Sequence, residues 1–553
     1  MKKILTVALF LLLVVLFAVS CKDNDTPAGT DGGDLQVFLS DGSSDYTLVY
    51  PLRYSSSSEG GQAVAELKDL IETNVGSFWE VKSDYVASET DLSSFDGAKE
   101  ILLGETNRKE SALAAAGLRE KDYVIKVVDK KLVVVGGSDA ANAAAIRRFA
   151  AMFFSKPQTA LILREDYVYE YRHDYALNSL TLDGVPLSSF TIVYDPTTES
   201  DARYLQNALL DLTGYRLSLS TDSEAENTIE FALSNEAGCF ASLKNGVLTL
   251  SGDTASNRAV AVSRFIDALS SSDSDTLALD SGFSIDNTLA NGVPLTVFDL
   301  NLYSTGYGEN SVNNRYPRLM TLIDKYRPSI LCLQDVSPTW LSNMKNGRDG
   351  VSPLTDTYAY VGTGRNNDDE SVMQAIFYDK SLYTLKDSGT FWLSETPEWE
   401  SVGWDGRTRS ICTWAILTEK TSGKEFAVMN TMLDPYGKKA QRNGAALILE
   451  RAEALGVPVI LAGDMQNIST NSVITTFTEY AFSNASVLAD SVGETGATVN
   501  AAFGNVNSFS SASDFVLASY GEFQIESYTL LKDLVEEEYV SNHWPILTKL
   551  VLD

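Results

Sequence analysis

The sequence predicts an α/β protein in which two small α/β modules precede a larger third domain. Strand-like runs of β-branched and aromatic residues alternate with helix-like apolar periods along the chain. The length of 553 residues exceeds that of one ordinary domain, and a hydrophobic content of 44% is enough for packed cores. One order of strands and helices also occurs twice before residue 290, which indicates an internal repeat.

The first module is expected over residues 36–174. Its expected elements are a strand at 46–50 (YTLVY), a helix with Val64, Leu67, Leu70 and Ile71 in its apolar period, strands at 100–103 and 131–135, and a helix over 140–153. His173 lies beside Asp174 in the polar link after these elements. We interpret it as a solvated linker histidine and not as half of a catalytic dyad.

The second module is expected over residues 175–290 and repeats this order. Its elements are a strand at 190–194 (FTIVY), a helix at 202–212, strands at 228–232 and 246–252, and a helix at 257–269. The pattern resembles the accessory α/β domain that precedes the catalytic barrel of hexosaminidases and glucuronidases. No barrel follows here, so the resemblance does not imply glycan hydrolysis.

The N-terminus is typical of an export signal. Lys2 and Lys3 precede an apolar run over residues 4–17, and small residues then lead to Cys21. This arrangement resembles the lipobox of bacterial lipoproteins, which implies a signal peptide over 1–20, a lipid on Cys21 that anchors the chain to a membrane, and a flexible tether over 21–35. The expected location is extracytoplasmic, at the cell surface or outer membrane. The alternative is a plain secretory signal in which Cys21 is incidental.

Charge and cysteine content exclude several functions. A formal net charge of -31 opposes binding of long nucleic acids, because that binding depends on Lys and Arg neutralising phosphates. The three remaining cysteines, Cys239, Cys332 and Cys412, are too few and too widely spaced for a disulfide framework or a zinc site. We expect them to be buried as small apolar residues.

The last segment, residues 293–553, carries an ordered series of short polar motifs at strand ends. These are Asn301, Gln334-Asp335, Asn430-Thr431-Met432-Leu433-Asp434, Gly463-Asp464-Met465-Gln466, Asp514, and Ser541-Asn542-His543. The series resembles that of the endonuclease/exonuclease/phosphatase superfamily. The resemblance implies a four-layer α/β sandwich with two facing sheets, and a divalent cation, Mg²⁺ or Mn²⁺, that acts on a phosphate ester.

The resemblance also implies a role for each matching residue. The catalytic group comprises Asp464, His543, Asn430 and Asn542; the metal ligands are Asn301, Asp335 and Asp514; Gln466 binds phosphate. Read without the resemblance, each of these side chains could instead be a polar group that caps a turn at the end of a strand.

Four of the motif positions depart from the family pattern. Asp335 replaces a glutamate and is one methylene shorter, and Met432 replaces a histidine with a thioether that carries no charge. Gln466 replaces an asparagine. Asn542 replaces an aspartate that we expect to orient His543, so that the histidine would lack its carboxylate partner.

These departures predict a catalytically impaired domain that acts by binding a phosphorylated or carbohydrate ligand, or a partner protein. One alternative is an active, metal-dependent phosphodiesterase or phosphatase with a rebuilt site that uses Asp299, Asp368, Asp369 or Glu370. Another is a purely structural envelope lipoprotein. Substrate and oligomeric state are not encoded in any motif of the chain.

Overall fold

A computed structural model describes residues 34–88, 90–222, 224–287, 292–466, 472–500 and 511–553. The predicted signal peptide and Cys21 lie outside these residues. Within them, no helix combines the length and apolar character required to cross a bilayer. The chain divides into two compact units, one that ends at His173 and one that begins at Asp174.

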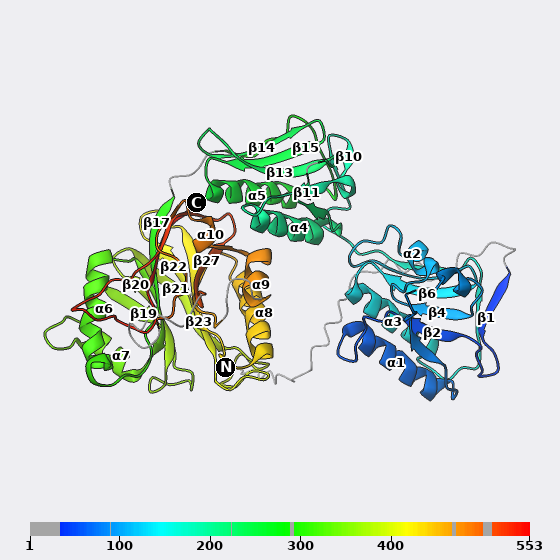
Figure 1. The fold of residues 1–553 in the computed structure, drawn as a ribbon, viewed down its shortest axis with the longest axis horizontal. Coiled ribbons are helices and arrows are strands. Elements are labelled where there is room, and N and C mark those ends of the chain that lie inside the picture. Colours follow the sequence, from blue (N-terminus) through cyan, green and yellow to red (C-terminus); the bar gives the residue numbers. More distant parts are fainter. Residues whose placement is uncertain (1–33, 89, 223, 288–291, 467–471, 501–510) are drawn as a thin grey trace, which may run out of the picture. The chain divides into compact units, whose positions relative to one another are not determined.

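The first unit contains a six-stranded sheet of order β3-β2-β4-β6-β5-β8. Its strands are β2 (Thr47–Tyr50), β3 (Val81–Ser83), β4 (Glu100–Leu103), β5 (Tyr123–Val128), β6 (Lys131–Gly136) and β8 (Val168–Tyr171). Helices α1 (Glu59–Asn74) and α3 (Asp139–Phe154) pack together on one face of the sheet (Figure 1). The shorter helix α2 (Lys109–Ala115) packs against the other face, and β1 (Leu35–Leu39) and β7 (Leu161–Arg164) form a separate ribbon.

The second unit begins with a module of the same plan. Its strands are β11 (Thr191–Val193), β12 (Ser218–Ser220), β13 (Thr228–Leu233), β14 (Cys239–Lys244) and β15 (Val247–Gly252), with helices α4 (Glu199–Thr213) and α5 (Ala255–Ser270). The order β12-β11-β13-β15-β14 corresponds strand for strand to β3-β2-β4-β6-β5, with the same parallel and antiparallel pairs. A small sheet of β9 (Ser179–Leu182), β10 (Val185–Pro186) and β16 (Thr276–Leu279) accompanies it. The main sheets of the two modules therefore share one strand order and one set of parallel and antiparallel pairs.

The rest of the second unit is the predicted four-layer α/β sandwich. One sheet has the order β19-β20-β18-β17-β29-β28-β26 and the other β21-β22-β23-β24-β27-β25. Helices α6 (Val312–Tyr326) and α7 (Pro338–Asn346) lie outside the first sheet, and α8 (Lys438–Ala454) and α9 (Ser472–Tyr480) lie outside the second (Figure 1). The strands of the first sheet are β17 (Val293–Asn301), β18 (Ile330–Val336), β19 (Tyr358–Val361), β20 (Met373–Asp379), β26 (Ser491–Val492), β28 (Phe523–Leu530) and β29 (Ile546–Leu552). Those of the second are β21 (Tyr383–Trp392), β22 (Ile411–Glu419), β23 (Glu425–Met432), β24 (Val459–Asp464), β25 (Phe482–Asn484) and β27 (Asp514–Ser519).

Strand periodicity explains the layers. Side chains along a strand alternate between its two faces, so Val297 of β17 packs in the core between the sheets while Phe298 packs under the outer helices. Ile460 and Leu461 of β24 divide in the same way. Both strands are buried on both faces, which is why they read as nearly continuous apolar runs in the sequence.

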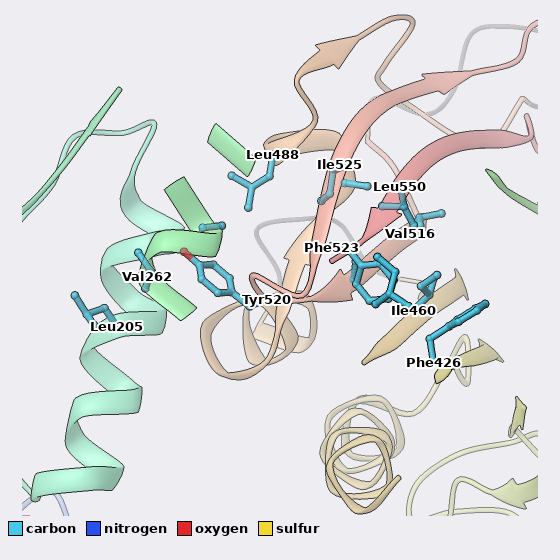
Figure 2. Packing of buried hydrophobic residues seen from close by; sticks show 14 of the residues in the cluster. Leu205, Val262, Phe426, Ile460, Leu488, Val516, Tyr520, Phe523, Ile525 and Leu550 are labelled. Carbon is cyan, nitrogen blue, oxygen red and sulfur yellow. The ribbon is translucent and has the colours of Figure 1, made fainter. Parts of the chain in front are cut away.

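The second module and the sandwich share one hydrophobic core. Figure 2 shows this cluster extending from Leu205 and Val262 on the module's helices, past Tyr520, to Phe523 and Ile460 in the sandwich. The rings of Tyr204 and Tyr520 stack with centroids 3.8 Å apart. The sequence predicts the module and the sandwich as separate domains, and no local pattern in it indicates this shared core.

A buried ion pair lies within the same contact. Arg258 Nε of α5 donates to Asp201 Oδ2 of α4 at 2.6 Å, and the Tyr520 hydroxyl donates to Asp201 Oδ1. All three side chains are almost fully buried. A buried charge is stable only when it is paired and hydrogen-bonded, so Arg258 and Asp201 depend on each other within the module, and Tyr520 of the sandwich adds a further hydrogen bond.

Cys239, Cys332 and Cys412 are buried and form no disulfide, as expected from their number and spacing. Cys332 belongs to the core between the two sheets of the sandwich, and Cys412 packs under the outer helices of the second sheet. Burial raises the pKa of the Cys412 thiol above its usual range, so it stays protonated.

Candidate functional site

The candidate site lies where the inward-facing rows of the two sheets end. On β17 the inward row is Val297, Asp299, Asn301, and on β24 it is Ile460, Ala462, Asp464. Both rows therefore change from apolar to polar at the end of the strand. Asn301 and Asp464 are hydrogen-bonded across the sandwich, with Asn301 Nδ2 donating to Asp464 Oδ2 at 3.0 Å.

Asp464 is fully buried and is enclosed by local hydrogen bonds. The side-chain amide of Gln466 donates to Asp464 Oδ2 at 2.7 Å, and the Gln466 backbone N–H donates to Oδ1 at 3.0 Å. Together with the Asn301 amide, three N–H groups therefore donate hydrogen bonds to the Asp464 carboxylate. Gln466 has a positive φ of 52°, which folds its side chain back toward Asp464.

His543 pairs with Asp514, the first residue of β27. Its Nδ1 lies 2.9 Å from Asp514 Oδ2 and 3.0 Å from Oδ1. The expectation that His543 lacks a carboxylate partner is therefore wrong. The partner comes from another strand and not from Asn542, whose side-chain oxygen accepts from Ser541 Oγ at 3.3 Å. Asp514 was predicted as a metal ligand, and the structure gives it this second role.

The electrostatics of the pair favour a charged imidazole. Burial alone would lower the pKa of His543, but the charge and hydrogen bond of Asp514, together with the nearby Asp464 and Asp299, raise it to about 9. Burial and the negative charge of Asp514 raise the pKa of Asp464 to about 7, although His543 and the hydrogen bonds oppose this shift. The site therefore holds a cationic imidazole beside a carboxyl group that titrates near neutrality.

Asp335 is not part of this group. It lies at a register shift between Leu333 and Val336 of β18 and has a positive φ of 58°. Its Oδ2 accepts a hydrogen bond from the Ser304 backbone N–H at 3.0 Å, and its own N–H donates to Gln374 Oε1 at 3.1 Å. The carboxylate expected to hold a metal therefore has a structural partner in the turn after β17.

The Asn430 side chain forms hydrogen bonds that link the two sheets. From β23 its amide nitrogen donates to the carbonyl oxygens of Leu333 at 3.0 Å and Ala375 at 2.9 Å, both in the facing sheet. Its amide oxygen accepts from Gln334 Nε2 at 2.8 Å. Because both ends of the side chain are occupied, the structure places this predicted catalytic residue between the sheets in a structural contact.

The residues suggested for a rebuilt site do not join the group either. Asp299 is fully buried between the sheets and accepts from Gln334 Nε2 at 2.7 Å. Burial and the charge of Asp514 raise the pKa of Asp299 well above its usual range. Asp368, Asp369 and Glu370 lie on the loop before β20 and are at least partly exposed.

The chain's residues fit a magnesium or manganese ion poorly. Within the described residues, a possible ligand set consists of Asp464, Asp514 and His543, with ligand atoms within 4.8 Å of one another. Both carboxylates already accept hydrogen bonds, and imidazole is a weaker ligand than oxygen for a hard cation that prefers six oxygens. Met432 Sδ, 3.9 Å from Asn301 Nδ2, adds a soft thioether. Asp335 is not part of the set.

Three supporting residues were not among the predicted site residues. Thr498 and Ser513 donate through their hydroxyls to Asp514 Oδ2, and Ser541 Oγ donates to the Asn301 carbonyl at 2.6 Å. They fix the orientation of the residues that were predicted. Ser541 stands in the Ser541-Asn542-His543 motif, but Thr498 precedes Asp514 by 16 residues and belongs to no recognisable pattern.

Comparisons with known proteins give the following. No family model and no curated protein matches the chain. An endonuclease/exonuclease/phosphatase family protein from Bacteroides thetaiotaomicron is 29% identical, and the match covers 48% of this chain and 100% of that one, with a TM-score of 0.44. A mannosyl-6-phosphatase from the same species is 29% identical over 47% of this chain and 100% of that one, with a TM-score of 0.43. An endonuclease/exonuclease/phosphatase from Bacteroides vulgatus is 24% identical over 47% of this chain and 100% of its own, with a TM-score of 0.44. Endonuclease/exonuclease/phosphatase proteins are thus among the structural neighbours of about half of this chain.

Proposed function

We propose that this chain is a lipid-anchored, extracytoplasmic protein whose sandwich is an endonuclease/exonuclease/phosphatase-like domain with impaired catalysis. In this proposal the domain binds a phosphorylated ligand at Asn301 and His543 without hydrolysing it. The membrane anchor is the lipid on Cys21, which the signal sequence and the following cysteine support.

One observation carries the proposal: the carboxylates needed for a metal have protein partners in place of an open coordination site. Asp464 accepts from Gln466 twice and from Asn301, and Asp335 accepts from the Ser304 backbone. A divalent cation would have to displace these donors before it could activate water or stabilise a phosphoryl group. His543, by contrast, is held in a charged form that can pair with an anion without metal.

A second candidate, an active phosphodiesterase or phosphatase, has its own support. A carboxyl group with a pKa of about 7 next to an imidazole with a pKa of about 9 forms a proton acceptor and donor pair of the kind found in active sites. In this alternative Gln466 swings away from Asp464, and Asp464 and Asp514 bind Mg²⁺ or Mn²⁺. The two candidates differ in their need for metal.

The test is calorimetric titration of the full chain with MgCl₂ and MnCl₂, together with turnover of bis(p-nitrophenyl) phosphate and an Asp464→Ala control. We expect no micromolar binding of either ion and the same background rate in both proteins. Micromolar binding with turnover that disappears in the Asp464→Ala variant would establish the active alternative and overturn the proposal.

The binding role has a separate readout. Phenyl phosphate in metal-free buffer should raise the melting temperature of the wild-type chain, because a ligand that binds only the folded state stabilises it. The His543→Gln variant should show no such rise. If neither protein responds, the site binds no phosphoryl group and the domain is structural.

A gain-of-function variant tests whether the departures from the family pattern are what weakens metal binding. The triple change Asp335→Glu, Met432→His, Asn542→Asp restores the family residues at three departures. We expect it to bind Mg²⁺ more tightly than the wild type, provided that the longer Glu side chain reaches past the Ser304 contact. Equal affinity in both proteins would show that these three positions do not limit metal binding.

A further inference from the structure

A group of exposed cations borders the candidate site on the side of the second sheet. We call the four cations Arg407, Arg409, Lys438 and Lys439, together with Tyr436, the basic rim. All five side chains are exposed. These residues lie near Asp464 because the chain after β23 runs beside the end of β24. The Asp464 carbonyl accepts from the Leu433 N–H at 3.0 Å, and the rim begins at the residues that contact the next position, Asp434.

Asp434 fixes the backbone of the rim. Its Oδ2 accepts from the N–H groups of Arg407 at 2.8 Å and Thr408 at 2.9 Å, and its Oδ1 accepts from those of Tyr436 and Gly437, both at 2.8 Å. Burial opposes the charged form, but these backbone hydrogen bonds outweigh it and lower the pKa of Asp434 to about 2. One carboxylate thus joins the loop before β22 to the turn before α8.

Asp405 holds the same loop to the start of α8. Its Oδ1 accepts from the Ala440 N–H at 2.8 Å, and its Oδ2 accepts from the Lys439 N–H at 3.2 Å. The cations of the rim therefore project from a backbone that is fixed on both sides. A preorganised backbone lowers the entropy lost when these side chains bind a ligand.

The cations of the rim have no carboxylate partner among the described residues, although the chain carries a net charge of -31. The Arg407 guanidinium lies over the Tyr436 ring, 5.0 Å from its centroid, and Arg409 Nη1 donates to Asn366 Oδ1 at 2.8 Å. Lys438 Nζ donates to Gln441 Oε1 at 3.3 Å. Four positively charged side chains thus lie near the end of β23 without an ion pair, where they favour an anion.

An exposed aromatic side chain lies among these charges. Tyr436 is 59% exposed, and the Arg407 guanidinium lies over its ring. Guanidinium groups bind carboxylate, sulfate or phosphate through paired hydrogen bonds, and flat aromatic rings offer an apolar surface to the C–H face of a sugar.

We propose that the basic rim binds an anionic sugar chain, one whose rings carry carboxylate, sulfate or phosphate groups. Arg407 and Arg409 bind the anionic substituents, and Tyr436 packs against a ring. The inference extends the ligand-binding role proposed for the sandwich domain and adds a surface outside its phosphoryl site. A long nucleic acid fits less well, because the net charge of -31 on the whole chain repels a polyanion.

Calorimetry with the full chain and three polysaccharides tests this assignment. The probes are polygalacturonate, dextran sulfate and uncharged dextran. We expect binding of at least one of the two anionic polymers, no binding of dextran, and a weakening of affinity as salt rises. Polygalacturonate and dextran sulfate distinguish carboxylate from sulfate as the preferred group. Equal binding of dextran, or equal or tighter binding of single-stranded DNA, would overturn the proposal.

A matched pair of variants separates the rim from bulk charge. Arg407→Gln with Arg409→Gln removes two charges from the rim, and Lys420→Gln with Lys424→Gln removes two charges near the turn between β22 and β23, at the other end of these strands. The first variant should weaken binding about tenfold, as expected for two exposed charge contacts, and the second should leave it unchanged. Equal losses in both would refute a specific site.

Two further variants distinguish polysaccharide binding at the basic rim from phosphate binding at Asn301 and His543. Tyr436→Ala should weaken polysaccharide binding about two- to fivefold, the scale of an exposed cation–π or stacking contact. His543→Gln should abolish the phenyl phosphate response and leave polysaccharide binding intact. If His543→Gln abolishes both, the two ligands share one site and the separate rim is refuted.

Discussion

Replacing Asp514 with asparagine should reverse the charge preference of His543. The exchange keeps the size of the side chain and leaves an oxygen for the hydrogen bond from Nδ1, but it removes the negative charge. Asp514 is the main cause that raises the pKa of His543 to about 9, against the effect of burial. Once that charge is gone, burial dominates, and the imidazole should become neutral at pH 7.

The size of the change follows from the geometry. Two unit charges 2.9 Å apart interact by about 6 kcal/mol at an effective dielectric constant of about 20. At about 1.4 kcal/mol per pKa unit, this corresponds to about 4 units as an upper bound. The asparagine oxygen still accepts a hydrogen bond and Asp464 remains nearby, so we expect a fall of more than about 2.5 units, to below the ordinary value of about 6.5.

The assay is a pH titration of the imidazole ring signals by NMR. The chain contains only two histidines, His173 and His543, so the spectrum has two such signals and a His173→Gln variant assigns them. Asp324→Asn is the matched control, because Asp324 is an exposed residue of α6 and the exchange has the same chemistry. The control should leave the pKa of His543 unchanged.

A pKa of His543 that stays near 9 in the Asp514→Asn variant would refute this reasoning. It would mean that Asp464 or Asp299 supplies the charge that holds the imidazole protonated, and that the pairing at 2.9 Å is incidental to the electrostatics. A fall of equal size in the Asp324→Asn control would also refute it, because a general charge effect would then explain the shift.

The pH dependence of stability and the contact between module and sandwich give three more predictions. His543 and Asp464 both have raised pKa values, so the folded state binds more protons than the unfolded state, and stability should fall as pH rises, through about 4 to 7 for Asp464 and about 6.5 to 9 for His543. Urea unfolding across this range should show the fall, and Asp464→Asn should remove its lower part; a flat profile in the wild type would contradict both shifts. Asp201→Asn should destabilise the second unit by about 3 to 5 kcal/mol in the same assay, because it leaves the buried Arg258 without its counter-charge. Tyr520→Phe removes only one hydrogen bond and should cost about 1 kcal/mol; a larger cost than Asp201→Asn would contradict this order.

The sequence by itself determined the class of the fold and the strand ends of the site, because both depend on local periodicity. Alternation along LTVFDLN puts Val297, Asp299 and Asn301 on one face, and the same rule applies to Ile460, Ala462 and Asp464. The repeat of strands and helices likewise follows from local patterns. These features needed no knowledge of which segments meet in space.

Only the tertiary structure decided which of these side chains pair. Asp514 and His543 are 29 residues apart, and Asp201 and Tyr520 are 319 apart, so no local pattern indicates either contact. The register shift that turns Asp335 toward Ser304 depends on the neighbouring strand. A carboxylate's role depends on the donors and charges within a few ångströms of it, and in this chain those are brought together by strands distant in the sequence.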